Sequence, residues 1–173
     1  MSEAAVTEEA LRLAIQMESE ARKFYLEASK NCGNEPGKKL FRSLAREEAA
    51  HRRDFAKIYE AVRTRYAWPE IEIISRKTRR KSLELTGITQ EMCDLTRPEE
   101  SELEAVKTAI QMENESYDYY QKQLVHAGYP GEKEFYTAIS AAENAHRLAL
   151  VDYLEFLTDP AAYFVSKEHP SLD

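Results

Sequence analysis

The heptapeptide AIQMESE at residues 14–20 recurs with one change as AIQMENE at residues 109–115, an offset of 95 residues. At the same offset, REEAAH at 46–51 corresponds to AAENAH at 141–146. The offset also pairs Tyr25 with Tyr120, Gly33 with Gly128, Glu48 with Glu143 and His51 with His146. Because one offset holds across well-separated segments, the sequence predicts a duplicated structural unit.

Composition favours an all-α fold for this unit. Of the 173 residues, 43% are hydrophobic and 32% are charged, with only 5 Gly and 6 Pro. The abundant Ala, Leu, Glu, Lys and Arg are good helix formers. Helix start and stop signals predict four long helices. They run from about Thr7 to Asn31, from about Pro36 to Tyr66, from a capping box at 96–99 to Gly128, and from just after Pro130-Gly131 to just before Asp159.

The duplication suggests how the four helices are organised. A chain of this length fits a single domain. We expect a first helical hairpin at 1–66, a crossover at 67–96, a second hairpin at 97–158 and a C-terminal tail at 159–173. Two αα-hairpins joined by one long crossover make a four-helix bundle with an approximate two-fold axis.

Each predicted helix carries an apolar stripe with steps of three and four residues, interrupted by one glutamate. The stripes are Leu11, Ala14, Glu18, Ala21, Tyr25, Ala28; Phe41, Leu44, Glu48, His51, Phe55, Ile58, Val62; Val106, Ala109, Glu113, Ser116, Tyr120; and Tyr136, Ile139, Glu143, His146, Leu150, Tyr153, Leu157. A carboxylate at a core position is costly unless it is paired or bound to a metal. The pattern therefore marks candidate ligands.

The four glutamates are predicted to lie at one level of the bundle. Glu18 and Glu48 are each 15 residues from Gly33, and their repeat partners Glu113 and Glu143 are each 15 residues from Gly128. At about 1.5 Å per residue, all four lie roughly 22 Å from their turns. His51 and His146 follow Glu48 and Glu143 by one helical turn, so six ligands converge on one point.

A set of four carboxylates and two imidazoles suits iron or manganese, because carboxylates can bridge two ions and an imidazole can bind each one. Two divalent ions would neutralise the four glutamates. Without metal, the buried carboxylates would repel one another and some would take up protons.

The segments QMESEARKFY, EEAAH, QMENESYDYY and AENAH, together with the C-terminal DPAAYFVSKEHPSLD, resemble the rubrerythrin branch of the ferritin-like superfamily. The resemblance implies a ferritin-like four-helix bundle that binds two iron ions, with manganese or zinc as possible substitutes. It implies Glu18, Glu48, His51, Glu113, Glu143 and His146 as ligands. It also implies that Tyr25 hydrogen-bonds a ligand carboxylate, with Tyr120 as its repeat partner. The implied activity is reduction of hydrogen peroxide, or oxidation of Fe(II) by O₂.

Two features depart from the rubrerythrin pattern. Rubrerythrins usually carry another glutamate three residues after the ligand of the third helix, where this chain has Ser116. The usual rubredoxin module with its CxxC motifs is also absent from the 173 residues. We therefore expect electrons from a separate donor protein, such as a rubredoxin, and we expect the chain to form a homodimer.

Other features narrow the class of protein. The formal net charge of −7 disfavours a nucleic-acid partner, and there is no apolar run long enough to cross a membrane. With no recognisable signal segment, the expectation is a cytoplasmic protein whose Cys32 and Cys93 are free thiols. Two alternatives stay open: an iron-storage protein of ferritin type with a ferroxidase centre, and a metal-free helical interaction module.

Overall fold

The computed structural model describes residues 3–65, 68–69 and 100–163. These residues form four long helices: α1 (Glu3–Asn31), α2 (Glu35–Arg65), α3 (Glu100–His126) and α4 (Pro130–Thr158). A short helical turn follows at 160–163, and the described residues contain no strand. The predicted all-α fold is confirmed.

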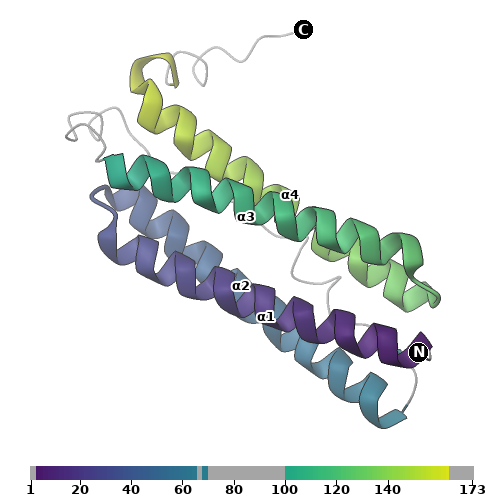
Figure 1. Cartoon of the computed structure of the whole chain (residues 1–173). Helices are drawn as coiled ribbons and strands as arrows, with labels where there is room; N and C mark the ends of the chain where they lie inside the picture. The colour runs from purple at the N-terminus through teal and green to yellow at the C-terminus, as the bar shows by residue number, and fades with distance from the viewer. Residues whose placement is uncertain (1–2, 66–67, 70–99, 164–173) are drawn as a thin grey trace, which may run out of the picture.

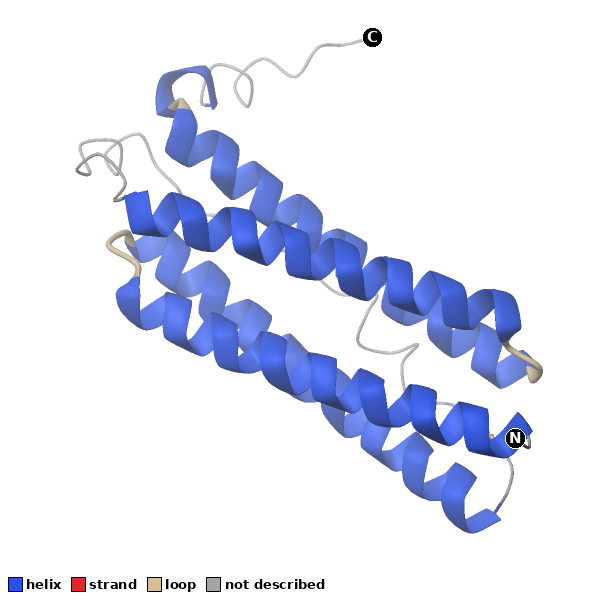
Figure 2. Ribbon diagram, viewed as in Figure 1, coloured by secondary structure: helices blue, strands red, loops and turns tan. Residues whose placement is uncertain are grey.

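The helices form a bundle of two antiparallel hairpins, α1 with α2 and α3 with α4 (Figure 1). Tight turns close the hairpins at opposite ends of the bundle (Figure 2). In Figure 1, α2 ends and α3 begins at opposite ends of the bundle, as a long crossover requires. The crossover predicted at 67–96 lies outside the described residues, apart from Trp68 and Pro69.

The predicted helix bounds differ from the observed ones most clearly at the starts of α1 and α4. The predicted start near Thr7 is wrong, because α1 already begins at Glu3 and the glutamate and alanines that precede Thr7 favour helix. Helix α4 begins at Pro130 itself, since a first helical residue needs no backbone donor. The capping box at 96–99 and the tail after Tyr163 lie outside the described residues.

The apolar stripes form two core clusters at different levels of the bundle. One contains Tyr25, Phe41, Leu44, Val106, Leu150 and Tyr153 among others. The other contains Leu11, Phe55, Ile58, Tyr120, Phe135, Tyr136 and Ile139 among others. Along each helix, the predicted glutamate falls between residues of the two clusters. The core thus leaves a polar layer near the middle of the bundle, with apolar side chains above and below it.

A separate polar network lies where the first hairpin turn meets α3 and α4. The Glu102 carboxylate is 3% exposed. Cys32 Sγ and Tyr153 Oη donate to its Oε1 at 2.6 and 2.5 Å, and Asn34 Nδ2 donates to its Oε2 at 2.9 Å. Burial, followed by the contact with Glu102, raises the pKa of the Cys32 thiol to about 12. The network stabilises the turn by giving the buried Glu102 side chain three hydrogen-bond donors.

Candidate metal centre

All six predicted ligands come together in the mid-bundle layer. The four glutamates are 1 to 2% exposed and His146 is 0% exposed, whereas the His51 side chain retains 13%. Each helix contributes one glutamate, and α2 and α4 each add a histidine one turn later, on the same inward stripe. The helical spacing of the sequence is therefore sufficient to align the side chains once the hairpins pack together.

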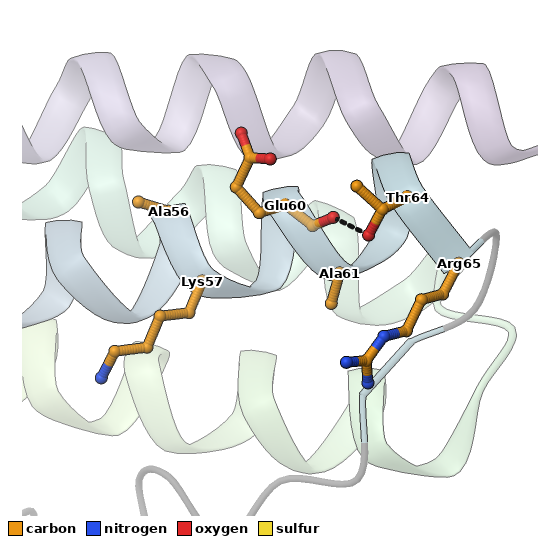
Figure 3. Close-up of a pocket in the computed structure, with 6 residues that line it drawn as sticks. All are labelled: Ala56, Lys57, Glu60, Ala61, Thr64 and Arg65. Carbon is orange, nitrogen blue, oxygen red and sulfur yellow. Dashed lines mark hydrogen bonds between the residues drawn. The ribbon is translucent and has the colours of Figure 1, made fainter.

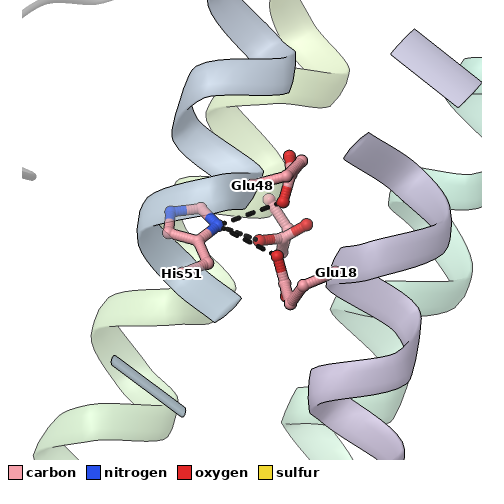
Figure 4. A group of neighbouring side chains, drawn as sticks. Glu18, Glu48 and His51 are labelled. Carbon is pink, nitrogen blue, oxygen red and sulfur yellow. Dashed lines mark hydrogen bonds and ion pairs between the residues drawn. The ribbon is translucent and has the colours of Figure 1, made fainter. Parts of the chain in front are cut away.

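Three of the glutamates surround His51. Its Nδ1 lies 3.2 Å from Glu48 Oε2, 3.4 Å from Glu18 Oε2 and 3.3 Å from Glu143 Oε1. Figure 4 shows Glu18 of α1 pointing toward Glu48 and His51 of α2. One ligand atom from each of Glu18, Glu48, His51 and Glu143 falls within 4.8 Å of the others. This spacing is compatible with one shared metal ion.

His146 and three glutamates form a second group of four. Nδ1 of His146 lies 2.9 Å from Glu48 Oε1 and 3.5 Å from Glu113 Oε2. Ligand atoms of Glu48, Glu113, Glu143 and His146 again fall within 4.8 Å of one another. Glu48 and Glu143 belong to both groups, while each remaining pair belongs to one. The arrangement thus offers two adjacent metal positions, with two carboxylates able to bridge them.

Atoms without hydrogen-bond partners test whether these residues fit a metal. Within the described part of the chain, five buried atoms of the centre lack a partner: Glu18 Oε2, Glu48 Oε1, Glu113 Oε2, Glu143 Oε1 and His146 Nδ1. The four oxygens lie within 3.5 Å of a histidine Nδ1 but not in hydrogen-bonding geometry. Unsatisfied buried polar atoms are rare because they cost about 1–3 kcal/mol each. Converging oxygen and nitrogen donors of this kind fit a pair of divalent cations.

Two tyrosines orient the outer carboxylates across the hairpins. The Tyr25 hydroxyl of α1 donates to Glu113 of α3, and the Tyr120 hydroxyl of α3 donates to Glu18 of α1. Both phenols are fully buried. Burial and the neighbouring carboxylates raise the pKa of each tyrosine well above its ordinary value. Each tyrosine therefore keeps its proton and stays a donor to one oxygen of Glu18 or Glu113.

Burial and mutual repulsion set the charge of the metal-free centre. Burial, then the charge of Glu48, raises the pKa of Glu18 to about 8. Burial and the charges of Glu48, Glu18 and Glu113 raise the pKa of Glu143 well above its ordinary value. Burial also disfavours the charged form of Glu48, but His146 and the neighbouring hydrogen bonds hold the pKa of Glu48 well below that value. Metal binding must therefore displace protons from Glu18 and Glu143.

The same carboxylates also shift the pKa of the two histidines. Burial opposes protonation of both rings. Contacts with Glu143, Glu18 and Glu48 nevertheless raise the pKa of His51 well above its ordinary value. The charges of Glu48 and Glu113 do the same for the pKa of His146. The two rings stack with centroids 5.4 Å apart. The carboxylates thus favour the protonated form of each imidazole in the metal-free protein.

The prediction missed one residue that contacts the centre, Glu47. The Glu47 side chain is 43% exposed, but its Oε2 also lies 3.3 Å from Nε2 of His146. The repeat pointed away from this residue, because its counterpart is Ala142. A sequence signal could not have revealed the contact, since it depends on how the two hairpins pack.

The position of the missing glutamate is also part of the core. Ser116 is 9% exposed and lies one turn after Glu113 on the inward face of α3. A serine hydroxyl cannot replace a carboxylate as a strong ligand for a hard cation. The centre therefore offers six ligands in a nearly symmetric set.

A surface hollow on α2 lies apart from this centre (Figure 3). It is lined by Ala56, Lys57, Glu60, Ala61, Thr64 and Arg65, and none of the six candidate ligands reaches it. Two of its polar side chains are paired within α2: Thr64 donates to the Glu60 carbonyl at 2.6 Å, and Lys57 contacts Asp54 at 3.3 Å.

Fold and site together define a ferritin-like bundle with a carboxylate and histidine cluster that could hold metal. The Rubrerythrin family model matches residues 9–153, so the chain belongs to the rubrerythrin family. No curated protein and no solved structure matches the chain. Among the described residues, no helix is long and apolar enough to cross a membrane.

Proposed function

We propose that the protein is a di-iron oxidoreductase of rubrerythrin type that reduces hydrogen peroxide or O₂ with electrons from a separate donor. The observation that carries the proposal is the pair of four-residue groups that share Glu48 and Glu143. A single metal would need only one such group. Family membership over residues 9–153 supports iron as the metal.

Each residue has a distinct role in this proposal. Glu18 and His51 would hold one iron, Glu113 and His146 the other, and Glu48 and Glu143 would bridge the two. When bound, the two Fe(II) ions would supply the two electrons that reduce peroxide to water, or that are passed to O₂.

The surrounding side chains control protons and water. Tyr25 and Tyr120 donate to Glu113 and Glu18, which fixes these carboxylates and leaves their second oxygens free to bind metal. The core clusters above and below the layer exclude bulk water and strengthen electrostatic interactions within the layer. His51 is the candidate ligand most open to solvent, which supports entry of a small oxidant beside α2.

The proposal also includes an electron donor and a second copy of the chain. No CxxC motif occurs in the sequence, so a separate redox protein such as a rubredoxin would return two electrons after each turnover. A homodimer is the proposed assembly, because residues 3–65 and 100–163 contain no fifth long helix of the kind that a storage cage uses.

Iron storage with a ferroxidase centre is the second candidate function. The buried Ser116 favours it, because without the extra glutamate the six-residue set resembles the symmetric centre of bacterioferritin. Native mass separates the two functions. A storage cage would be many times heavier than a dimer of the 20.0 kDa chain.

Stopped-flow oxidation tests the proposed reaction. Protein loaded with Fe(II) without oxygen is mixed with peroxide or O₂, and ferric absorbance is followed. We expect rapid oxidation by at least one oxidant, and loss of it in Glu48→Ala and Glu143→Ala with helical circular dichroism retained. Wild-type iron that resists both oxidants, or variants that react as fast as wild type, would overturn the proposal.

A further inference from the structure

The two histidines of the centre differ in what their outer nitrogens contact. Nε2 of His146 lies 3.3 Å from the Glu47 carboxylate of the opposite hairpin. Within the described residues, no group lies within hydrogen-bond or ion-pair distance of Nε2 of His51. The position of α4 that corresponds to Glu47 holds Ala142, which has no acceptor. The six candidate ligands are therefore arranged symmetrically, but the contacts of the two outer histidine nitrogens are not.

A carboxylate at the outer nitrogen changes what the inner nitrogen can do. A neutral imidazole has one N–H, and an acceptor at Nε2 holds the proton there. The lone pair of Nδ1 then faces Glu48 and Glu113, where that atom has no hydrogen-bond partner. Such a contact fixes the ring and raises its basicity, and loss of it typically weakens metal binding 10–100-fold. Nothing among the described residues does the same for His51.

Exposure adds to the difference. His146 is 0% exposed, whereas the side chain of His51 retains 13% exposure. An imidazole that is buried and hydrogen-bonded needs less ordering when it binds a metal, because its orientation is already set.

We propose that Glu47 positions His146 and so makes the two metal positions unequal. The position at Glu113 and His146 binds a divalent metal more tightly, and the position at Glu18 and His51 is the exchangeable one. The inference rests on the proposed metal centre. It gives the two ions different roles, one held permanently and one that can leave and return through the more open side.

Calorimetric titration of the metal-free protein with Mn(II) tests the inference through binding rather than activity. Wild type shows a tight and a weak step. Glu47→Gln weakens the tight step by about tenfold and leaves the weak step unchanged. The control Glu115→Gln removes an equal charge from an exposed glutamate that accepts a hydrogen bond from Gln111, and it leaves both steps unchanged.

A second variant restores the missing carboxylate. Ala142→Glu places an acceptor where the repeat predicts the outer nitrogen of His51, so it strengthens the weak step. Ala142 is 7% exposed, and an added carboxylate could disturb packing. If circular dichroism shows a lower melting temperature for metal-free Ala142→Glu, the result for Glu47→Gln decides alone.

The outcomes separate the inference from the proposed function. Absence of Mn(II) binding in wild type would contradict the metal centre itself. Two Mn(II) ions bound, with both steps unchanged in Glu47→Gln, would overturn the inference alone. Equal weakening of both steps would also overturn it, because a merely structural role of Glu47 acts on the whole bundle.

Discussion

Helix α3 carries two glutamates, Glu102 and Glu113, that are almost equally buried, at 3% and 2% exposure. Glu102 receives hydrogen bonds from Cys32, Tyr153 and Asn34, so both of its oxygens are satisfied. Glu113 receives one hydrogen bond from Tyr25, and its second oxygen has no hydrogen-bond partner among the described residues. The two carboxylates share a helix and a degree of burial but differ in their partners.

The comparison shows that burial does not distinguish a ligand from a structural carboxylate. A carboxylate with donors at both oxygens stabilises the fold and has nothing left to offer a cation. A carboxylate that keeps one unpartnered oxygen, aimed at similar atoms, destabilises the metal-free fold and can bind a metal. An unpartnered carboxylate oxygen therefore distinguishes a candidate metal ligand from a structural carboxylate. Substitutions around Glu102 and in the metal centre should separate effects on metal binding from effects on stability.

The largest expected effect is on metal content. Glu143→Gln removes a carboxylate common to both metal positions, so iron content falls from two per chain to less than one. Stability of the metal-free protein should not fall, because burial and the neighbouring carboxylates disfavour the charged form of Glu143 and raise its pKa, and glutamine keeps the shape of the side chain. Glu102→Gln should do the opposite, keeping both irons and losing about 1–3 kcal/mol of stability. Metal analysis and urea unfolding check the pair, and similar metal loss in both variants would contradict the distinction.

The pH dependence of stability should differ in sign with and without metal. Glu18 has a folded pKa of about 8 against an ordinary value of 4.5, so its contribution is present below pH 4.5 and lost as pH rises toward 8. The raised pKa of both histidines acts in the same direction above pH 6.5. The lowered pKa of Glu48 acts only below pH 4.5.

Melting temperatures between pH 5 and 8 check this sign. The metal-free protein should become less stable as pH rises, with a shallower slope in Glu18→Gln. Mn(II)-bound protein should gain stability from the metal over the same range, because binding displaces protons. A metal-free slope that is identical in wild type and Glu18→Gln would show that Glu18 does not carry a raised pKa.

An added methyl group should disturb the Glu102 network without reaching the metal centre. A Cβ at Gly37 would come closer to Tyr153 Oη and Cys32 Sγ than atoms can approach. Gly37→Ala is therefore expected to lose about 1–3 kcal/mol of stability through overpacking, while iron content stays at two per chain. Urea unfolding measures the loss. Unchanged stability would mean that the turn is less tightly packed than the structure indicates.

The smallest effects should come from the tyrosine donors. Tyr153→Phe removes one of three donors to Glu102, and we expect a loss of about 1 kcal/mol of stability with no change in metal affinity. Tyr25→Phe removes the donor to Glu113, and we expect metal affinity to fall by about tenfold. Calorimetric titration with Mn(II) and urea unfolding compare the two variants. Equal changes in metal affinity would contradict the separate roles of the two glutamates.

The fold and the convergence of six residues could be predicted because both depend on local spacing. Steps of three and four fix which side chains share a helix face, and equal distances from the turns fix their height. A single Glu-x-x-His motif is weak evidence for a metal centre, and its repetition at the same offset made the prediction specific. The shared role of Glu48 and Glu143 did not follow from spacing, because it depends on side-chain directions within the packed bundle.

Other contacts depended on packing between distant segments. Glu102 extends the inward stripe of α3 by one step before Val106, so a longer stripe would have marked it. Its partners come from the first hairpin turn and from α4, which no local pattern connects. The contact between Glu47 and His146 depends on how the two hairpins are rotated relative to each other.

The early start of α1 before Thr7 shows that a good N-cap residue does not stop a helix when the residues before it also favour helix.

Metal stoichiometry tests the central claim most directly. Protein stripped of metal, reconstituted with Fe(II) without oxygen and freed of excess iron should contain two iron ions per chain by inductively coupled plasma mass spectrometry. Glu48→Ala, which lacks a carboxylate common to both positions, should contain less than one. Wild-type protein that retains fewer than one transition-metal ion per chain would contradict the account.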